Sequence, residues 1–426
     1  MQIFKILVIF IILSSHSSIA NLTEIEKKII KQIDLNLTES IQFLEKTIQI
    51  NSGTFNHKGI KDCGLLYQNK LNLLGFKTIW HKLPIELNRA DHLFAYRKGK
   101  KGKRLLLIGH LDTVFEPENP QQKIEYKKNM LFGPGSADMK GGNMIIVYAL
   151  KALDQLGLLD NTTITVALHS DEESAGRPLS ESRKHIISAA KKSDIGLGFE
   201  GGTLNTAVIS RRGTSQWELK VSGRELHSSL IFNTMAGSGS IFETARILNE
   251  FRKQLSNEKY LTLNPGIIIG GSQISFKNNY KAVVAGKDNI IAKQTIVRGD
   301  LRFISNDQKE KARSIMKKIT FNSLPHTKAK ITFNEGYPGM PPSEGNEYLL
   351  KQFSLINEAL GFGKVIANDP NSRGAADISF VSNYVDSLDG LGINGGGAHS
   401  QNEYVNLSNL DHYIKRAAIL IYRLTR

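Results

Sequence analysis

Cysteine is nearly absent from this chain of 426 residues, which contains only Cys63. A single thiol cannot form an internal disulfide, so the fold must be stabilised by packing or by bound metal. Repeats and low-complexity tracts are also absent, which excludes a solenoid. Beyond the first 20 residues, no apolar run approaches the length of about 20 residues that a membrane-spanning helix needs.

The first 20 residues have the pattern of a secretory signal. Lys5 provides a positive charge, residues 6–13 form an unbroken apolar core, and small residues at Ser18 and Ala20 suit signal peptidase. The alternative is an uncleaved anchor. We expect a mature chain that begins near Asn21, is exported to the periplasm or the medium, and has no membrane contact after cleavage.

The formal net charge of +15 favours contact with anionic substrates or surfaces. The densest basic run, residues 97–104, contains glycines and no interleaved aromatic residues. These features favour a solvated hairpin turn over a nucleic-acid site. We therefore expect no nucleic-acid partner.

Residues 105–114 look like a buried strand that ends in polar side chains. Four aliphatic residues and a glycine precede His110 and Asp112, which point the same way in an extended chain. A neutral imidazole binds zinc well, and a nearby carboxylate can orient it. The alternative is a strand-end histidine that is hydrogen-bonded to its neighbour.

Four further segments deliver metal-ligand side chains from strand ends or glycine-rich loops. Parallel strands of open α/β sheets place their sites at the carboxyl ends, and two histidines with three carboxylates suit two zinc ions that share one carboxylate. Taken singly, each segment also fits a structural turn or a solvated acidic loop. The segments are residues 132–142 with Asp138 before a helix at 143–156, the strand 162–168 followed by Glu172 and Glu173, the strand 195–199 followed by Glu200, and residues 394–404 with His399 before a helix at 410–424.

Hydrophobic periodicity predicts the remaining elements of the first part of the chain. We expect one helix or a helix pair at residues 24–51, a helix at 63–74, and strands at 77–81 and 92–96.

Residues 212–335 have a different pattern, β-α-β-β-α-β, which is typical of a ferredoxin-like sandwich. The expected strands are 216–221, 266–276, 296–303 and 329–333, and the expected helices are 239–255 and 307–319. We predict that this sandwich is inserted into an α/β domain with a mostly parallel sheet, formed by residues 21–211 and 336–426.

Four motifs in this order resemble those of the co-catalytic zinc exopeptidase and deacylase superfamily, which includes glutamate carboxypeptidase, acetylornithine deacetylase, succinyl-diaminopimelate desuccinylase and peptidase T. The resemblance covers the whole mature chain and is closest to the glutamate carboxypeptidase branch. The motifs are residues 109–114 (Gly-His-Leu-Asp-Thr-Val), 133–142 (Gly-Pro-Gly-Ser-Ala-Asp-Met-Lys-Gly-Gly), 171–173 (Asp-Glu-Glu) and 397–405 (Gly-Ala-His-Ser-Gln-Asn-Glu-Tyr-Val).

The resemblance implies a zinc-hydrolase catalytic domain with two Zn²⁺ ions and a cis peptide bond between Asp138 and Met139. It also implies roles for individual residues. One zinc is expected on His110 and Glu200, the other on Glu173 and His399, with Asp138 bridging; Glu172 is expected as general base and Asp112 as the group that orients His110.

The inserted domain is expected, by the same resemblance, to act as a lid and to form a homodimer. His227 matches a lid histidine that polarises the scissile carbonyl, often across the dimer. Asn289 and Arg302 match residues that hold the carboxylate end of the substrate, a task that suits a guanidinium group. Without the resemblance, each could equally be an exposed polar side chain on a sheet.

Three positions depart from the family pattern. Ala292 replaces a proline, Arg373 lies in a loop that is more often all glycine, and Tyr337 stands where glutamate-specific members place an arginine. Glutamate specificity therefore does not carry over, and one hypothesis is that Arg373 takes over a carboxylate-binding role.

The resemblance implies a metallocarboxypeptidase that hydrolyses an amide bond next to a free C-terminal carboxylate. The expected substrate is a peptide or an N-acyl amino acid. An N-acyl amino acid deacylase or an aminopeptidase would use the same motifs. Glu200 favours a carboxypeptidase or a deacylase over an aminopeptidase, because aminopeptidase relatives tend to have aspartate there. A non-catalytic binding protein on this fold is the alternative of another class.

Overall fold

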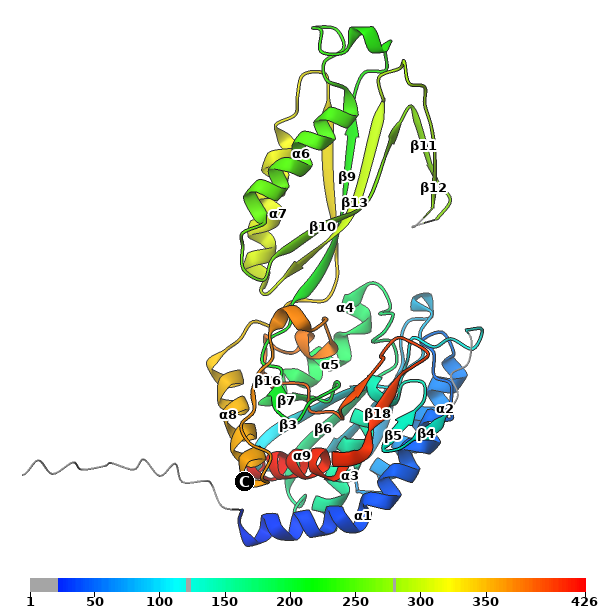
Figure 1. Cartoon of the computed structure of the whole chain (residues 1–426). Coiled ribbons are helices and arrows are strands. Elements are labelled where there is room, and N and C mark those ends of the chain that lie inside the picture. The colour runs from blue at the N-terminus through cyan, green and yellow to red at the C-terminus, as the bar shows by residue number, and fades with distance from the viewer. Residues whose placement is uncertain (1–21, 120–123, 279–280) are drawn as a thin grey trace, which may run out of the picture.

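The computed structural model describes residues 22–119, 124–278 and 281–426, so the predicted signal segment lies outside the described residues. The chain forms two parts, a larger one around a six-stranded sheet and a smaller one around a four-stranded sheet (Figure 1). Within the described ranges, no helix has both the length and the apolar character needed to cross a bilayer.

The large sheet has the strand order β1-β2-β6-β3-β7-β16. The strands β6, β3, β7 and β16 are mutually parallel, and β1 and β2 are added antiparallel at one edge. This arrangement confirms the predicted α/β fold with a mostly parallel sheet. The strands are β1 (Lys77–His81), β2 (His92–Arg97), β3 (Lys101–His110), β6 (Thr162–His169), β7 (Ile195–Gly198) and β16 (Asp386–Leu388).

Strand β3 is buried on both faces, as its aliphatic run predicts. Leu105 and Leu107 belong to the core on one face of the sheet, and Leu106 and Ile108 belong to the core on the other. The alternation follows from the two-residue period of an extended chain. Because helices cover both faces of the sheet, the end of β3 at His110 is the part of the strand where a ligand can bind.

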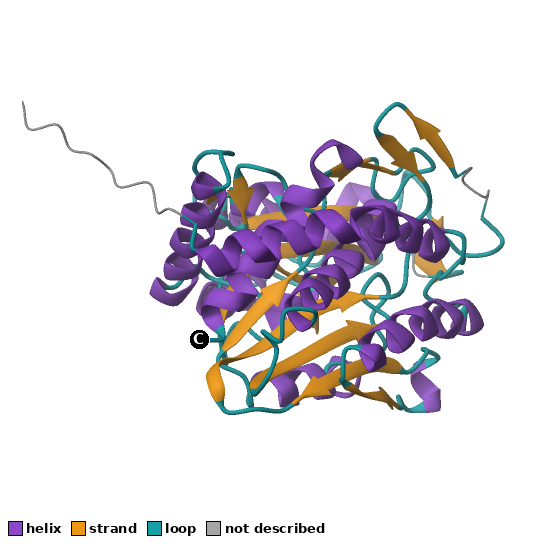
Figure 2. Cartoon of the chain, turned by 90° about the horizontal axis from the view of Figure 1, so that it is seen from below, coloured by secondary structure: helices purple, strands orange, loops and turns teal. Residues whose placement is uncertain are grey.

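Helices cover both faces of the sheet (Figure 2). One face packs against α1 (Glu24–Ile48), α2 (His57–Leu73), α3 (Gly141–Asp154), α8 (Glu344–Ala359) and α9 (Leu410–Leu424). The other face packs against α4 (Leu179–Ser182), α5 (Lys184–Ala190) and residues 376–385.

Two small sheets flank the carboxyl edge of the large sheet. The first has the order β17-β18-β5-β4 and brings the segment near residue 400 beside the segment near residue 133. Its strands are β4 (Glu125–Lys127), β5 (Met130–Phe132), β17 (Gly395–Gly396) and β18 (Tyr404–Asn406). The second pairs β8 (Thr206–Ala207) with β15 (Ile366–Ala367).

The smaller part has the predicted β-α-β-β-α-β order and the antiparallel strand order β10-β13-β9-β14. Its core includes Trp217, Phe251, Val297 and Met316, which join the sheet to both helices. The elements are β9 (Gly213–Ser222), α6 (Gly239–Leu255), β10 (Thr262–Gly271), β13 (Gln294–Phe303), α7 (Asn306–Phe321) and β14 (Lys328–Glu335).

The two parts are joined by a pair of hydrogen-bonded segments, which we call the hinge (residues 211–214 and 337–340). Arg211 and Met340 exchange two backbone hydrogen bonds, both of 2.9 Å, and the Thr214 N–H donates to the Tyr337 carbonyl at 2.8 Å.

The predicted hairpin turn at residues 97–104 is wrong. Strand β6 lies between β2 and β3, so the strands on either side of the basic run are not neighbours. The run passes over the start of β6, where the backbone N–H groups of Lys100 and Lys101 donate to the Asn161 carbonyl at 2.8 and 2.9 Å. A local turn signal does not reveal that a later strand is inserted between the two.

Two element boundaries also differ from prediction. The expected strand 266–276 divides into β10 and β11 (Gln273–Phe276), and β11 pairs with β12 (Ala282–Ala285). A side chain at Gly271 would approach the Ala285 carbonyl oxygen to 2.8 Å, so glycine allows β12 to pass closely. Helix α2 begins at His57 rather than residue 63, because Asn56 caps it by accepting from the Gly59 N–H.

Candidate metal centre and active site

Three neighbouring strands end at the same edge of the large sheet and deliver polar side chains there. His110 is the last residue of β3, Glu172 and Glu173 follow β6, and Glu200 follows β7. Since β3 lies between β6 and β7 and runs parallel to both, these ends meet.

Asp138 reaches this edge from a distorted turn, Ser136–Lys140, just before α3. The peptide bond between Asp138 and Met139 is cis, as the resemblance implies. His399 comes from the loop between β17 and β18 and has a positive φ of 63°.

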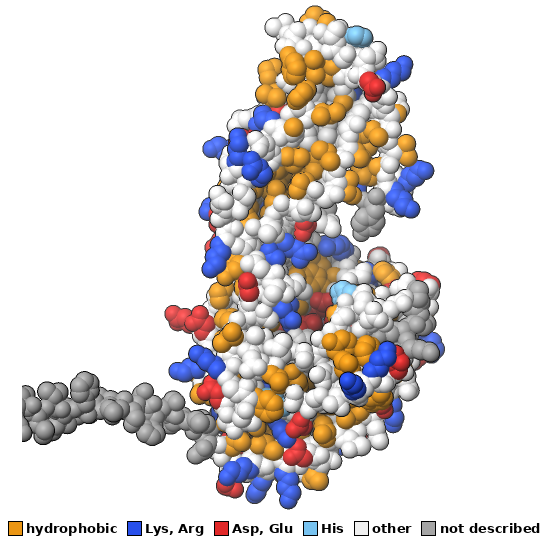
Figure 3. Space-filling view, in the orientation of Figure 1, with side chains coloured by type: hydrophobic (Ala, Val, Ile, Leu, Met, Phe, Trp, Pro, Cys, Tyr) orange, Lys and Arg blue, Asp and Glu red, His pale blue; other side chains and the backbone are white. Residues whose placement is uncertain are grey.

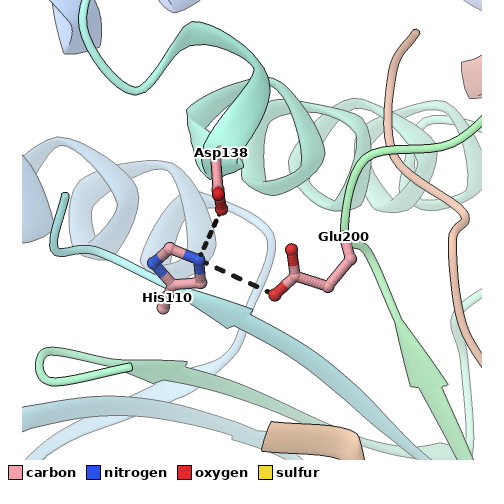
Figure 4. Close-up of side chains that lie close together, drawn as sticks. All are labelled: His110, Asp138 and Glu200. Atoms are coloured by element: carbon pink, nitrogen blue, oxygen red, sulfur yellow. Dashed lines mark hydrogen bonds and ion pairs between the residues drawn. The ribbon is translucent and has the colours of Figure 1, made fainter. Parts of the chain in front are cut away.

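A first group of ligand-type side chains consists of His110, Asp138 and Glu200 (Figure 4). The His110 Nε2 atom lies 3.1 Å from Asp138 Oδ1 and 3.7 Å from Glu200 Oε1. The second group consists of Asp138, Glu173 and His399. The His399 Nε2 atom lies 3.0 Å from Asp138 Oδ2 and 3.1 Å from Glu173 Oε2.

The two groups share Asp138, which offers one carboxylate oxygen to each. In each group the ligand atoms all lie within 4.8 Å of one another. Ligands about 2.0–2.1 Å from a tetrahedral zinc ion are about 3.3 Å apart, which is close to these separations. The Glu173 Oε1 atom is buried without a hydrogen-bond partner. The donor set therefore fits two divalent cations that share one carboxylate.

The pKa shifts in the cluster reflect several acidic groups that are packed close together. Hydrogen bonds to Asp138 and Glu173 raise the pKa of His399 to about 11. Burial and the charge of Asp138 raise the pKa of Glu200 to about 8. Burial opposes the ionisation of Asp138, but hydrogen bonds from His110 and His399 outweigh it and lower its pKa. Closely packed carboxylates favour a compensating positive charge.

Asp112 is fully buried and connects His110 to the loop after β6. Its carboxylate lies 3.4 Å from His110 Nδ1, which lies closer, at 3.0 Å, to the Asp112 carbonyl oxygen. It also accepts hydrogen bonds from the backbone N–H groups of Glu172 and Glu173 at 3.0 and 3.1 Å and from Thr54 Oγ1 at 2.7 Å. Through these hydrogen bonds, Asp112 links the end of β3 to the loop that carries Glu172 and Glu173 and to the segment at Thr54.

The Glu172 side chain faces the same cavity as the two ligand groups. Burial and nearby carboxylates, Glu200 among them, raise the pKa of Glu172 well above its ordinary value. Its backbone carbonyl accepts a 2.7 Å hydrogen bond from the Tyr337 hydroxyl, which in turn accepts one from Arg183 at 2.7 Å. Tyr337, one of the three positions that depart from the family pattern, therefore fixes the loop that carries Glu172.

A buried network behind this loop was not predicted from the sequence. Arg183 donates to the carboxylates of Asp171 at 2.6 Å and Asp377 at 2.8 Å, and Asp377 also contacts His169. These residues come from three separate segments, and only the three-dimensional structure brings them together.

Glu403 is a second residue that sequence reasoning missed, although it lies inside the quoted motif at residues 397–405. Its buried carboxylate accepts backbone hydrogen bonds from Gly135, Ala137 and Asp138 at 3.0, 2.8 and 2.9 Å. Glu403 thus fixes the turn that presents Asp138.

A cavity of about 420 Å³ opens beside the two ligand groups. Figure 3 shows acidic and basic side chains together with a histidine in the hollow between the two parts of the molecule. Besides the acidic residues, the lining contains the guanidinium groups of Arg211 and Arg373 and several glycines. The predicted Arg373 therefore reaches the cavity, and Arg211 joins it without having been predicted.

The three residues predicted in the smaller part do not reach this cavity. Among the described residues that line it, none belongs to the smaller part beyond the hinge. His227 and Asn289 are exposed, and the His227 ring contacts Ser229 Oγ at 2.9 Å. Arg302 donates to Asp300 at 2.9 Å. Their roles in catalysis and substrate binding stay predictions.

The family comparison agrees with this geometry. Residues 106–423 match the model of peptidase family M20/M25/M40. The chain belongs to this family. Members of the M20 family are metal-dependent hydrolases that typically bind two metal ions, which agrees with the paired ligand groups around Asp138.

Two curated M20 relatives are similar over nearly the whole chain. Carboxypeptidase G2 of Pseudomonas sp. (strain RS-16) is 27% identical over 389 residues, which cover 89% of this chain and 88% of the relative. A succinyl-diaminopimelate desuccinylase of Buchnera aphidicola subsp. Cinara cedri is 24% identical over 402 residues, covering 88% and 95%. The expected enzyme class, a metallopeptidase or amidohydrolase, is thereby confirmed.

The fold matches solved M20 structures. The crystal structure of the aminopeptidase PepT from Bacillus cereus ATCC 10987 superposes with a TM-score of 0.73 at 16% identity, covering 92% of this chain and 99% of that one. This likeness concerns the fold alone.

Proposed function

We propose that this M20 protein is a di-zinc carboxypeptidase that hydrolyses an amide bond next to a free C-terminal carboxylate. The observation that carries the proposal is the pair of ligand groups around Asp138, with Glu172 beside them at a cavity that contains two arginines. The similarity to carboxypeptidase G2 supports the substrate class.

In this proposal His110 and Glu200 hold one ion, Glu173 and His399 hold the other, and Asp138 bridges them. Divalent ions bound there would make a nearby water more acidic and would polarise the scissile carbonyl. Glu172 takes a proton from the attacking water as the water oxygen bonds to the amide carbon. It then returns the proton to the amide nitrogen as the carbon–nitrogen bond breaks and the amine leaves. Asp112 fixes His110 and the Glu172 loop in the geometry that this proton transfer needs.

The predicted roles of His227, Asn289 and Arg302 require the smaller part to approach the cavity, or a second copy of the chain to supply them. We propose a homodimer in which His227 of one subunit donates a hydrogen bond to the developing oxyanion in the other. Asn289 and Arg302 would bind the C-terminal carboxylate. We also propose export to the periplasm or medium, for which the pattern of residues 1–20 is the support.

A deacylase of N-acyl amino acids is the second candidate. It uses the same chemistry on the same side of the amide bond, and the similarity to succinyl-diaminopimelate desuccinylase favours it. The two candidates differ only in whether the acyl group is a peptide or a simple acid.

The test is a hydrolysis screen with the purified full chain, stripped with a chelator and reloaded with Zn²⁺. Dipeptides and N-acyl amino acids are compared with the same compounds carrying a C-terminal carboxamide. We expect zinc-dependent cleavage that is lost when the carboxylate is blocked. Cleavage that tolerates the carboxamide but needs a free amino terminus would instead identify an aminopeptidase.

A further inference from the structure

Arg211 is a hinge residue whose buried guanidinium faces the cavity with one nitrogen unpaired. The residue is 3% exposed; Nε donates to Asp389 at 2.6 Å and Nη1 to the Gly374 carbonyl at 2.7 Å. The Nη2 atom has no hydrogen-bond partner. A buried charged donor without a partner is costly unless a ligand or solvent satisfies it.

Arg373 brings a second guanidinium to the same wall of the cavity. Its Nη2 atom donates to the Gly201 carbonyl at 2.5 Å, and its Nε atom is buried without a partner. Burial and the positive charge of Arg211 lower the pKa of Arg373. Two like charges held this close are stabilised by an anion placed between them.

The space beside these donors is kept open by glycines. An added Cβ at Gly374 would meet no atom within 4 Å, and one at Gly201 would meet its nearest atoms only at 4.0 Å. The cavity therefore has open space beside the two guanidinium groups.

Among the described residues, Arg373 forms no ion pair with a carboxylate, whereas Arg211 does. Asp389 pairs with Arg211 at 2.6 Å. The carboxylates of Asp389, Glu200 and Asp138 act on Arg373 only from beyond ion-pair distance. Divalent ions bound by the two ligand groups would offset the carboxylates there, and the guanidinium of Arg373 would remain available to a ligand anion.

We infer that Arg373 and Arg211 form an anion subsite for a second carboxylate of the substrate, so that the preferred substrates are dicarboxylic. The inference rests on the proposed function, because the first carboxylate is the C-terminal one next to the scissile bond. A bidentate guanidinium–carboxylate contact from Arg373, with Arg211 Nη2 as an additional donor, matches the planar geometry of that group.

The second carboxylate can come from either side of the scissile bond, and matched ligand pairs distinguish the two sources. N-acetyl-glutamate is compared with N-acetyl-glutamine for an acidic leaving amino acid. N-succinyl-alanine is compared with its succinamide analogue for an acidic acyl group. Affinities are measured by calorimetry on zinc-loaded protein that carries Glu172→Gln, so that the ligands are not turned over.

Three changes are introduced into this background. Arg373→Gln and Arg373→Met remove the charge with and without a polar replacement. Arg252→Gln is the matched control, because it removes an exposed arginine of α6 that lies outside the cavity lining. Circular dichroism confirms that each protein is folded.

We expect one of the two pairs to show a carboxylate preference of about 10- to 100-fold, the range for a hydrogen-bonded charge pair. Both Arg373 substitutions should bring that ratio close to one, and Arg252→Gln should leave it unchanged. Equal affinities within both pairs, or a preference that survives both Arg373 substitutions, would overturn the subsite.

The affinity measurements test the anion subsite separately from the proposed hydrolytic function. If the wild-type enzyme hydrolyses none of the four compounds but the carboxylate preference depends on Arg373, the anion subsite stands and the proposed hydrolytic function fails. If the enzyme hydrolyses the neutral compounds as well as the acidic ones, the function stands and the subsite fails.

Discussion

The Glu403 carboxylate accepts a hydrogen bond from the backbone N–H of Asp138 at 2.9 Å, and the Asp138 side chain is shared by both ligand groups. The two residues are far apart in the sequence, and the small sheet β17-β18-β5-β4 brings them together. A residue that touches no ligand atom thereby controls the position of the side chain on which both groups depend.

Glu403→Gln should therefore weaken metal binding without removing any proposed ligand. The amide replaces an oxygen that accepts backbone hydrogen bonds with a donor, which tilts the turn that carries Asp138. Loss of such outer contacts typically costs about 10- to 100-fold in metal affinity. Titration with Zn²⁺ measures the effect, and Glu86→Gln on the exposed surface is the control. Unchanged affinity would show that the turn is rigid without Glu403.

Glu172→Gln should bind two equivalents of Zn²⁺ but lose turnover by a factor of about 10² to 10⁴, the usual contribution of a general base. The isosteric amide cannot accept the proton. Metal analysis together with kcat on the substrate found in the screen checks both halves of this expectation. Retained turnover would contradict the assignment of Glu172 as the base.

Removal of metal should destabilise the fold, because the carboxylates around Asp138 then repel one another. At a free Zn²⁺ concentration about 100 times Kd, binding adds about 2.7 kcal/mol of stability per site. Thermal unfolding with chelator and with added Zn²⁺ should show this rise in Tm. Asp138→Asn should abolish most of the rise, and identical Tm values in all conditions would speak against a metal centre here.

The stability at acidic pH should depend on Glu39, which joins three helices. Its carboxylate in α1 accepts from Lys70 of α2 at 2.5 Å and also contacts Lys151 of α3. Burial opposes ionisation, but the hydrogen bonds from Lys151 and Lys70 outweigh it and lower the pKa of Glu39 from 4.5 to about 2. The stabilisation is therefore complete above pH 4.5 and is lost as the pH falls towards 2.

Glu39→Gln should accordingly lower the free energy of unfolding at pH 6, and with it Tm. The loss should be at most about 1 kcal/mol, because the side chain is partly exposed. The difference from wild type should shrink steadily below pH 4.5. A difference that stays constant between pH 6 and pH 3 would indicate that the effect is not ionic.

Activity should be restored when two inactive variants, Glu172→Gln and His227→Gln, are unfolded, mixed and refolded together. If His227 acts across the dimer, a mixed dimer contains one site with an intact Glu172 and an intact His227. Random pairing then gives about a quarter of the wild-type activity. An inactive mixture that nevertheless contains dimers would mean that His227 acts within its own subunit.

The sheet and the ligand groups could be predicted because their signals are local. The aliphatic run of β3 and the polar residues after β3, β6 and β7 each appear in a few consecutive residues, and parallel pairing then brings the strand ends together. The spacing of His110 and Asp112 likewise follows from the period of an extended chain.

Features that depend on distant pairing could not be predicted. The insertion of β6 between β2 and β3 overturned the hairpin expected at residues 97–104. The acceptors around Arg183 and the donors around Glu403 lie far from them in the chain. Arg211 looks like an ordinary basic residue before a strand, and its role is visible only once the hinge carries its side chain to the cavity.

The hinge has a consequence for how binding and motion are related. Its two hydrogen-bonded segments also carry Arg211, whose side chain lines the cavity, and Tyr337, whose hydroxyl holds the Glu172 loop. A rotation of the smaller part about these segments would displace both side chains, and a ligand that contacts them would resist it. Ligand binding and the orientation of the smaller part would then be linked, and a ligand would shift that orientation only by as much as its affinity differs between the two arrangements.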